Sequence, residues 1–229
     1  NLEVKTRTSV AAYHGYNYLL ARENLTDHLE KKDKQGKIRQ RLLKIRAKKV
    51  ILATGALERP LIFNNNDRPG IMLSSAVNKY ADFYGVVCGR KTVFFTNNDS
   101  AYESAFCLHN KGIKIEAIID IRDNSNSKIV KAVEDVGIKI HWSHTVVDTS
   151  GYKRLKNISV MKLSNDGMSV TGNRIKISSD CLGVSGGWTP AVHLFTQSGG
   201  KLSFDEENKV FLPNKYPSEQ ISIGSCNGD

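Results

Sequence analysis

The sequence has no long apolar run, no recognisable export signal and no paired cysteines, and each absence excludes a class of protein. The longest apolar stretches, such as residues 50–53 and 115–119, are far shorter than the roughly 18–20 residues of a membrane-spanning helix. The first residues lack the ordered basic, apolar and small-residue regions of a signal peptide. The cysteines lack the spacing of a metal site or a redox pair; they are Cys88, Cys107, Cys181 and Cys226. We therefore expect a cytoplasmic protein with free thiols, no metal and no membrane partner.

The chain has fewer acidic than basic residues. It contains 23 aspartates and glutamates against 33 lysines and arginines, which gives a formal net charge of +10. Such an excess is compatible with a nucleic-acid or membrane partner. The only dense basic cluster, residues 31–37, surrounds Gly36 and is typical of a solvated hairpin turn. No aromatic residue interleaves with it, as a platform for single-stranded nucleic acid requires. We expect no nucleic-acid partner and infer that absent protein subunits balance the charge.

The first third of the chain has the pattern of an antiparallel meander followed by one buried strand. The meander strands are expected at residues 6–13, 17–22 and 38–45. The apolar run 49–53 is too short for a helix and predicts a buried strand that stops at Thr54-Gly55. After a loop over 58–69, residues 73–84 predict a helix that ends at Gly85, with its inner face formed by Ala76, Val77, Tyr80 and Ala81.

Strands alternate with helices in the middle of the chain, and this pattern predicts right-handed βαβ units on a parallel sheet. The expected strands are 92–95, 115–120 and 138–142, and the expected helices are 99–111 and 127–136. A second meander follows, with strands at 145–148, 155–163 and 173–177. Residues 181–184 then form a short apolar strand that runs into Ser185-Gly186-Gly187.

The predicted fold class is α/β, with a Rossmann-like βαβαβ unit and its antiparallel meander inserted in a partial FAD/NAD(P)-binding-type domain. Residues 1–86 are expected to form the first part of the outer domain, 87–187 the inner NAD(P)-type domain, and 188–229 the return segment of the outer domain. The sequence starts without Met and ends just after a strand-like segment, so we expect it to be cut from a longer polypeptide.

The inner domain lacks the glycine-rich turn on which a dinucleotide pyrophosphate rests. No G-x-G-x-x-G occurs in the chain, and Thr96 and Asn98 stand in the first two glycine positions after the strand 92–95. Asp99 is expected to cap the next helix but places a carboxylate where phosphate would sit. Asp120 lies about where an acidic residue holds a ribose. Without the turn, the inner domain is predicted to be structural.

Several longer runs carry a resemblance to a known family. They are residues 53–60 (ATGALERP), 66–72 (NDRPGIM), 95–102 (FTNNDSAY), 185–188 (SGGW) and 193–200 (HLFTQSGG). Together they resemble the alpha subunits of heterotetrameric sarcosine oxidases, over residues 6–228. Alpha subunits of amine, proline and opine dehydrogenases share some of these runs in looser form, and remain an alternative. A second alternative is an NAD(P)H-dependent FAD oxidoreductase of the disulfide-reductase type.

The resemblance implies a complex of alpha, beta, gamma and delta subunits that oxidatively demethylates sarcosine to glycine. Oxygen is reduced to hydrogen peroxide, and tetrahydrofolate takes the released one-carbon unit. The family places FAD in the beta subunit, FMN at the alpha–beta interface and a bound, non-turning-over NAD in the alpha subunit. The residues themselves show no Ser–His–Asp, Cys–His or paired-carboxylate arrangement, so we predict a scaffold without catalytic residues of its own.

The candidate cofactor-binding residues follow the two outermost buried strands. The resemblance implies that Ala53, Thr54 and Gly55 lie near the adenosine or pyrophosphate of the outer site. In flavin-binding relatives a Gly-Asp pair closes the last strand, where this chain has Gly224 and Ser225. The missing carboxylate favours NAD over FAD at that place. The first βαβ segment of the outer site, with its phosphate loop, is expected to precede residue 1.

Overall fold

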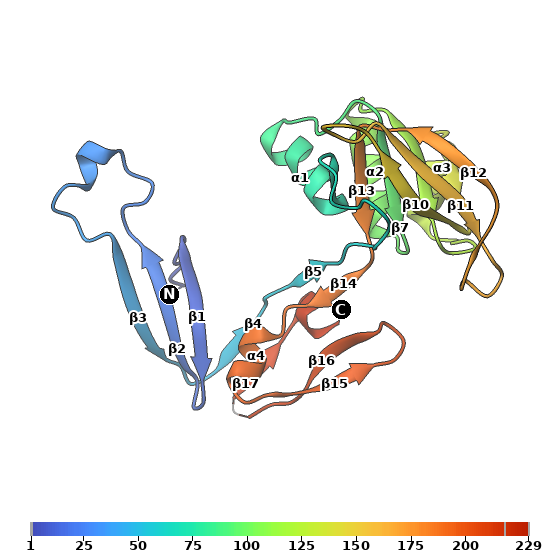
Figure 1. Ribbon diagram of the computed structural model, residues 1–229. Coiled ribbons are helices and arrows are strands. Elements are labelled where there is room, and N and C mark those ends of the chain that lie inside the picture. Colours follow the sequence, from blue (N-terminus) through green and yellow to red (C-terminus); the bar gives the residue numbers. More distant parts are fainter. Residues whose placement is uncertain (1, 218, 229) are drawn as a thin grey trace. The chain divides into compact units, whose positions relative to one another are not determined.

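The computed structural model describes residues 2–217 and 219–228 (Figure 1). The chain divides into two compact units, which we call the outer unit (Asn1–Leu57 with Thr189–Asp229) and the inner unit (Glu58–Trp188). Strands β5 (Ala56–Glu58) and β14 (Trp188–Pro190) carry the chain between the units and pair with each other. The inner unit is therefore one continuous segment, whereas the outer unit is built from two.

The outer unit combines an antiparallel meander with a pair of parallel strands. Its elements are β1 (Thr8–His14), β2 (Tyr18–Asn24), η1 (Lys31–Lys34), β3 (Gln40–Arg46), β4 (Val50–Leu52), α4 (His193–Gln197), β15 (Lys201–Asp205), β16 (Val210–Lys215), β17 (Gln220–Ser222) and η2 (Gly224–Asn227). The meander has the order β1-β2-β3, β15 pairs with β16, and β17 pairs in parallel with β4. A small core of Tyr13, Leu19, Val50, Leu52 and Phe195 joins the meander to β4 and α4.

The buried side chain of Asn17 links the meander to both of the chain segments that form the outer unit. The Tyr13 hydroxyl donates to Asn17 Oδ1 at 2.6 Å. Asn17 Nδ2 lies 3.1 Å from the carbonyl oxygens of Lys48 and Glu219. Lys48 lies two residues before β4, and Glu219 directly precedes β17. Because an unsatisfied buried amide is costly, this arrangement fixes where β4 and β17 begin.

The inner unit is a three-layer α/β structure around a five-stranded parallel sheet of order β6-β13-β7-β8-β9 (Figure 1). Its elements are β6 (Ile71–Leu73), α1 (Ser74–Tyr84), β7 (Thr92–Thr96), α2 (Ser100–Asn110), β8 (Ile115–Asp120), α3 (Lys128–Asp135), β9 (Ile140–His141), β10 (His144–Ser150), β11 (Asn157–Leu163), β12 (Val170–Ser178) and β13 (Cys181–Ser185). Strands β10, β11 and β12 form a separate antiparallel sheet.

Alternation along β7 divides the core between the two faces of the parallel sheet. Phe94 belongs to the cluster made with the three helices, whereas Val93 and Phe95 belong to the cluster made with the antiparallel sheet. Successive side chains of a strand point to opposite faces, so one fully buried strand serves both layers. This explains why all five residues of β7 are buried.

The predicted fold class is confirmed, while the division into units differs from the predicted one. The boundary expected at residues 86/87 lies at 57/58, and that expected at 187/188 lies at 188/189. The reason is that β6 pairs with β13 and α1 packs on the same sheet, so residues 58–86 belong to the inner unit. The expected inner face of α1 was wrong at Tyr80, which is 44% exposed. The hairpin β15–β16 and helix α4 were not predicted.

Close packing at the centre of the inner sheet gives a test of this arrangement. A Cβ on Gly183 in β13 would lie 2.6 Å from Cε1 of Phe94, whose side chain is fully buried. Overpacking of a tight core costs about 1–3 kcal/mol. We expect Gly183→Ala to lower the free energy of unfolding of the full chain by about that amount, measured by urea titration.

Two variants control this measurement. Gly15→Ala adds the same methyl group where nothing lies within 4 Å, so it should leave the urea midpoint nearly unchanged. Phe94→Leu in the Gly183→Ala background removes the ring edge that clashes and should recover part of the lost stability. A Gly183→Ala protein as stable as the original chain would show that the approach of β13 to Phe94 is wrong.

Candidate functional site

The structure brings the two predicted site segments to one edge of the outer unit. Strand β17 pairs with β4 in parallel register, with Ser222 opposite Leu52, and Ile223 N donates to Leu52 O at 2.9 Å. Segments 53–55 and 224–225 follow the carboxyl ends of these neighbouring strands. That edge is where ligands bind in open α/β sheets. We call this group of five predicted residues the outer edge.

Two glycines shape the outer edge. Gly55 has φ +71° and Gly224 has φ +66°, in the left-handed region that favours glycine. A Cβ at either position would meet nothing within 4 Å. The turns therefore require glycine for their backbone conformation, and the space beside them is open to an approaching ligand.

The other outer-edge residues differ in how freely they can contact a ligand. Thr54 Oγ1 donates to Ala191 O at 2.7 Å, and Ala191 N donates to Gly55 O at 2.9 Å. The Thr54 hydroxyl proton is thus committed to holding the loop. Ala53 and Ser225 are exposed, while Cys226, one residue on, is buried. Of the predicted side chains, the Ser225 hydroxyl is the one best placed for a polar contact.

The corresponding edge of the inner unit is filled by its own side chains. Asn98 Nδ2 donates to Ser185 Oγ at 3.0 Å, which links the turn after β7 to the end of β13. Asn98 Oδ1 accepts from Ser100 N at 3.1 Å and so satisfies the start of α2. The predicted helix cap was wrong, because Asp99 has αR backbone angles and its side chain makes no capping bond.

Asp99 instead forms part of a charge network. Arg122 Nη1 lies 2.8 Å from Asp99 Oδ1, and Arg122 Nη2 lies 2.8 Å from Asp120 Oδ2. The Tyr102 hydroxyl donates to the same Asp120 oxygen at 2.7 Å. Asp120 is completely buried. Its carboxylate, which stands about where an acidic residue could hold a ribose, is thus hydrogen-bonded by protein groups.

The network also sets the ionisation of its members. Burial and the Asp120 carboxylate raise the pKa of Tyr102, which keeps its hydroxyl protonated as a donor. Burial by itself would raise the pKa of Asp99, but hydrogen bonds from Ser127 and Arg122, with the Arg122 charge, lower it overall. An ionised carboxylate therefore stands at the start of α2. Such a group repels a phosphate placed beside it.

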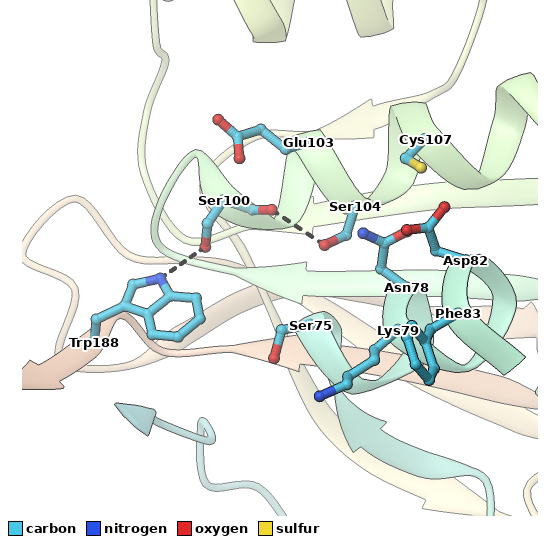
Figure 2. Close-up of a pocket in the computed structure, with 10 residues that line it drawn as sticks. All are labelled: Ser75, Asn78, Lys79, Asp82, Phe83, Ser100, Glu103, Ser104, Cys107 and Trp188. Atoms are coloured by element: carbon cyan, nitrogen blue, oxygen red, sulfur yellow. Dashed lines mark hydrogen bonds between the residues drawn. The ribbon is translucent and has the colours of Figure 1, made fainter. Parts of the chain in front are cut away.

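A hollow of about 580 Å³ lies between α1 and α2 of the inner unit (Figure 2). It is lined by Ser75, Asn78, Lys79, Asp82, Phe83, Ser100, Glu103, Ser104, Cys107 and Trp188. Trp188 Nε1 donates to Ser100 Oγ at 3.1 Å and forms one wall, as Figure 2 shows. The lining brings a thiol near carboxylates but includes no histidine to activate it. Sequence patterns did not indicate this hollow, because they assigned α1 to the outer domain.

Other classes of site are missing from the described residues. Within 2–217 and 219–228, no three His, Cys, Asp or Glu side chains gather as a metal site would require. All four cysteines are free thiols. None of the described helices is long and apolar enough to span a bilayer.

The relatives found by sequence comparison are alpha subunits of sarcosine oxidases. No protein-family model matches the chain. It is 37% identical over 222 residues to the sarcosine oxidase alpha subunit of Corynebacterium sp. (strain U-96), covering 97% of this chain and 23% of that protein. For the alpha subunit of Corynebacterium sp. (strain P-1) the identity is 38% over 224 residues, with the same coverage. The chain thus spans less than a quarter of the length of these relatives.

Solved structures with a similar fold include a disulfide reductase and a dehydrogenase. The bacillithiol disulfide reductase of Staphylococcus aureus aligns with 99% of this chain and 64% of its own, at a TM-score of 0.63 and 14% identity. The L-proline dehydrogenase of P. horikoshii aligns with 96% of this chain and 36% of its own, at a TM-score of 0.60 and 20% identity. At such identities the likeness shows the fold alone.

The charge network predicts a dependence of stability on pH. The pKa of Asp99 lies lower in the folded than in the unfolded chain. As the pH falls below about 4, the unfolded chain therefore binds a proton at Asp99 first, and the free energy of unfolding decreases. Asp99→Asn should remove this contribution and flatten the acid part of the curve. Because the side chain is 36% exposed, we expect an effect of about 1 kcal/mol or less.

The measurement is urea unfolding between pH 2.5 and pH 6 at constant ionic strength. Asp33→Asn in the exposed η1 is the control, because it changes the net charge by the same amount. It therefore separates the effect of the Asp99–Arg122 pair from the effect of the overall charge. Superimposable curves for Asp99→Asn and the original chain would show that the Asp99–Arg122 pair does not contribute to acid stability.

Proposed function

We propose that the chain, which is 37–38% identical to two sarcosine oxidase alpha subunits over 97% of its own length, is a nucleotide-domain scaffold of such a subunit. It has no catalytic centre of its own in this proposal. The observation that carries it is the contrast between two sheet edges. The outer edge is open beside Gly55 and Gly224, whereas the inner edge is filled by Asn98 and the Asp99–Arg122 pair.

The outer edge is proposed to form one wall of the dinucleotide site of the complete alpha subunit. Ala53, Thr54 and Gly55 would line the adenosine or pyrophosphate side, and Gly224 and Ser225 the opposite end of the wall. Glycine at both turns lets the backbone approach a phosphate closely. The ligand we propose is NAD, because Ser225 cannot supply the carboxylate that contacts a flavin in related domains. The glycine-rich phosphate loop would come from the remainder of the subunit.

The complete protein is proposed to be an oxidase of secondary amines assembled from alpha, beta, gamma and delta subunits. Its reaction converts sarcosine to glycine and oxygen to hydrogen peroxide, with transfer of the one-carbon unit to tetrahydrofolate. FAD and FMN would supply the redox chemistry at sites outside this chain. The support is the identity to the named alpha subunits and a fold shared with FAD-dependent oxidoreductases.

A second candidate is the alpha subunit of an amine, proline or opine dehydrogenase. The fold likeness to an L-proline dehydrogenase favours keeping this candidate. An NAD(P)H-dependent FAD oxidoreductase is disfavoured, because it needs an inner dinucleotide turn and Asp99 occupies that place. The complete complex can be assayed for oxygen consumption with sarcosine, proline and opines. Proline or opine oxidation without sarcosine oxidation would replace our first candidate by the second.

The proposed wall can be tested on the complete alpha subunit purified with its partners. Gly55→Leu forces a side chain into both the left-handed turn and the space beside it. We expect the bound NAD to fall at least tenfold, measured by releasing and quantifying the nucleotide. Gly36→Leu is the matched control, because Gly36 has φ +74° and open space but lies in the connection between β2 and β3. A Gly55→Leu subunit that keeps stoichiometric NAD would remove Gly55 from the wall.

The isolated 229-residue chain gives an independent test of the scaffold role. Without the phosphate loop, it should bind NAD and FAD only weakly, with dissociation constants well above the micromolar range. Isothermal titration calorimetry checks this directly. Sub-micromolar binding of either nucleotide would mean that the chain holds a complete site, and the proposal would then be wrong.

A further inference from the structure

The turn between β9 and β10 brings two histidines together at the carboxyl edge of the inner sheet. The rings of His141 and His144 lie 5.4 Å apart in an edge-on arrangement. His141 is 8% exposed and is the only buried histidine in the described part of the chain. Burial disfavours the charged form of imidazole, so the fold favours an uncharged ring at this place. We call residues 141–144 the histidine corner.

A hydrogen bond fixes the ring of His144. Its Nδ1 atom lies 2.6 Å from the carbonyl oxygen of Trp142. A carbonyl oxygen only accepts hydrogen bonds, so Nδ1 carries the hydrogen and Nε2 is the atom that can take up a proton. The ring therefore stays in place beside His141 when it becomes charged.

The groups around His141 oppose a positive charge on its ring. Burial lowers the pKa of His141, and the neighbouring Lys139 and His144 lower it further. Across the antiparallel register, Lys162 of β11 stands opposite His144. A proton on either histidine thus meets a second imidazole and two lysines.

Carboxylates of the neighbouring segments are engaged by other groups. They are Glu116 (by Lys114), Asp120 (by Tyr102 and Arg122), Asp123 (by Ser143) and Asp148 (by Asn64 and Asn65). The influences on His141 all lower its pKa, and none of them comes from a carboxylate. A charged imidazole at the corner is therefore stabilised by water once the corner opens.

Backbone bonds hold the corner to two other segments of the inner unit. Ser143 N donates to Arg122 O, just after β8, at 2.8 Å, and Leu163 N at the end of β11 donates to Ser143 O at 2.7 Å. Ser143 has φ +54°, in the left-handed region that residues other than glycine seldom adopt. These bonds thus keep Ser143 in an unfavourable conformation, which is relieved when they break.

The corner also contacts the side chains that fill the inner edge. The ring of Trp142 stacks on that of Tyr102, with centroids 6.1 Å apart and 20° between the planes. Tyr102 binds the buried Asp120 carboxylate, and Arg122 binds the same carboxylate through its guanidinium group. Movement of the corner therefore reaches the charge network through both a ring contact and a backbone bond.

We propose that the histidine corner is a pH-sensitive latch on the inner edge, which opens when a proton binds to His141. Opening separates Ser143 from Arg122 and Trp142 from Tyr102, so water reaches both the charged imidazole and the charge network. The latch goes beyond the scaffold role and needs no partner subunit. Either proposal can therefore fail without the other.

The direction of the pH dependence follows from the lowered pKa of His141 in the closed corner. As the pH falls below about 6.5, the open form binds the proton before the closed form does. The closed corner is thus fully stable above that pH and loses stability below it. One proton changes the opening equilibrium by at most about tenfold for each pH unit.

The test is amide hydrogen exchange of the 229-residue chain, followed by NMR at pH 7.5 and pH 5.5 and corrected for the intrinsic exchange rates. We expect the protection of the Ser143 and Leu163 amides to fall by about threefold to tenfold at the lower pH. The control within the same spectrum is the amide of Leu182 in β13, which donates to Gly70 O at 2.8 Å. Its protection should not change.

A matched pair of variants identifies the titrating group. His141→Gln removes the proton site, so the protection of Ser143 should no longer depend on pH, even where the variant lowers it at both pH values. His193→Gln removes an exposed histidine of α4 in the outer unit and should keep the pH dependence of the original chain.

Three results would each overturn the proposal. Equal protection of Ser143 at the two pH values would show that the corner does not open. An equal loss of protection at Leu182 would show that the whole unit unfolds instead of the corner. An undiminished pH dependence in His141→Gln would show that another group takes up the proton.

Discussion

The insertion of β13 between β6 and β7 is the constraint on which the inner unit depends. Gly183, Leu182 and Val184 pair with β6 on one side and with β7 on the other. These contacts join residues about 90 and 110 positions apart in sequence, so the loop-closure entropy is large and is offset only when the whole sheet forms. The absence of a side chain at Gly183 lets Phe94 fill the helical side of the sheet.

The outer unit has a similar long-range pairing. Its strand β17, near the C-terminal end of the sequence, pairs in parallel with β4. In both units a C-terminal strand thus brings a small-residue turn to the carboxyl edge of a parallel pair. The two edges differ in the residues that come directly after the strands. Gly55 and Gly224 leave open space, whereas the inner edge holds Asn98 and two carboxylates joined through Arg122.

Electrostatics explains why a small rearrangement does not open the inner edge. Removing one partner of a buried ion pair costs about 3–5 kcal/mol, and Asp120 is completely buried. A diphosphate would add negative charge beside Asp99. Two like charges 4 Å apart repel by about 4 kcal/mol at the effective dielectric of a protein surface. The network therefore keeps the inner edge filled by protein groups, which supports the architectural role proposed for the inner unit.

The sequence predicted those features that depend on local patterns. The strand–helix alternation, the parallel sheet, the antiparallel meanders and the absence of a glycine-rich turn all follow from short periodicities and from single residue types. The place of β6 in the inner sheet was not predictable in this way, because its three residues pair only with β13. Asp99 is a residue type that often caps helices, but its carboxylate pairs with the nearby Arg122 instead. The backbone N–H of Ser100, at the start of α2, donates to the side chain of Asn98.

The misplaced face of α1 has a physical cause. Tyr80 follows Val77 at helical spacing and therefore looks like a core residue, yet the sheet beneath α1 accommodates only Val77 and its smaller neighbours. The larger rings of Tyr80, Phe83 and Tyr84 lie near the C-terminal end of the helix and remain exposed, where burial would gain roughly 25 cal/mol for each Å² removed from water. Helical spacing alone therefore does not show which apolar side chains of α1 reach the core.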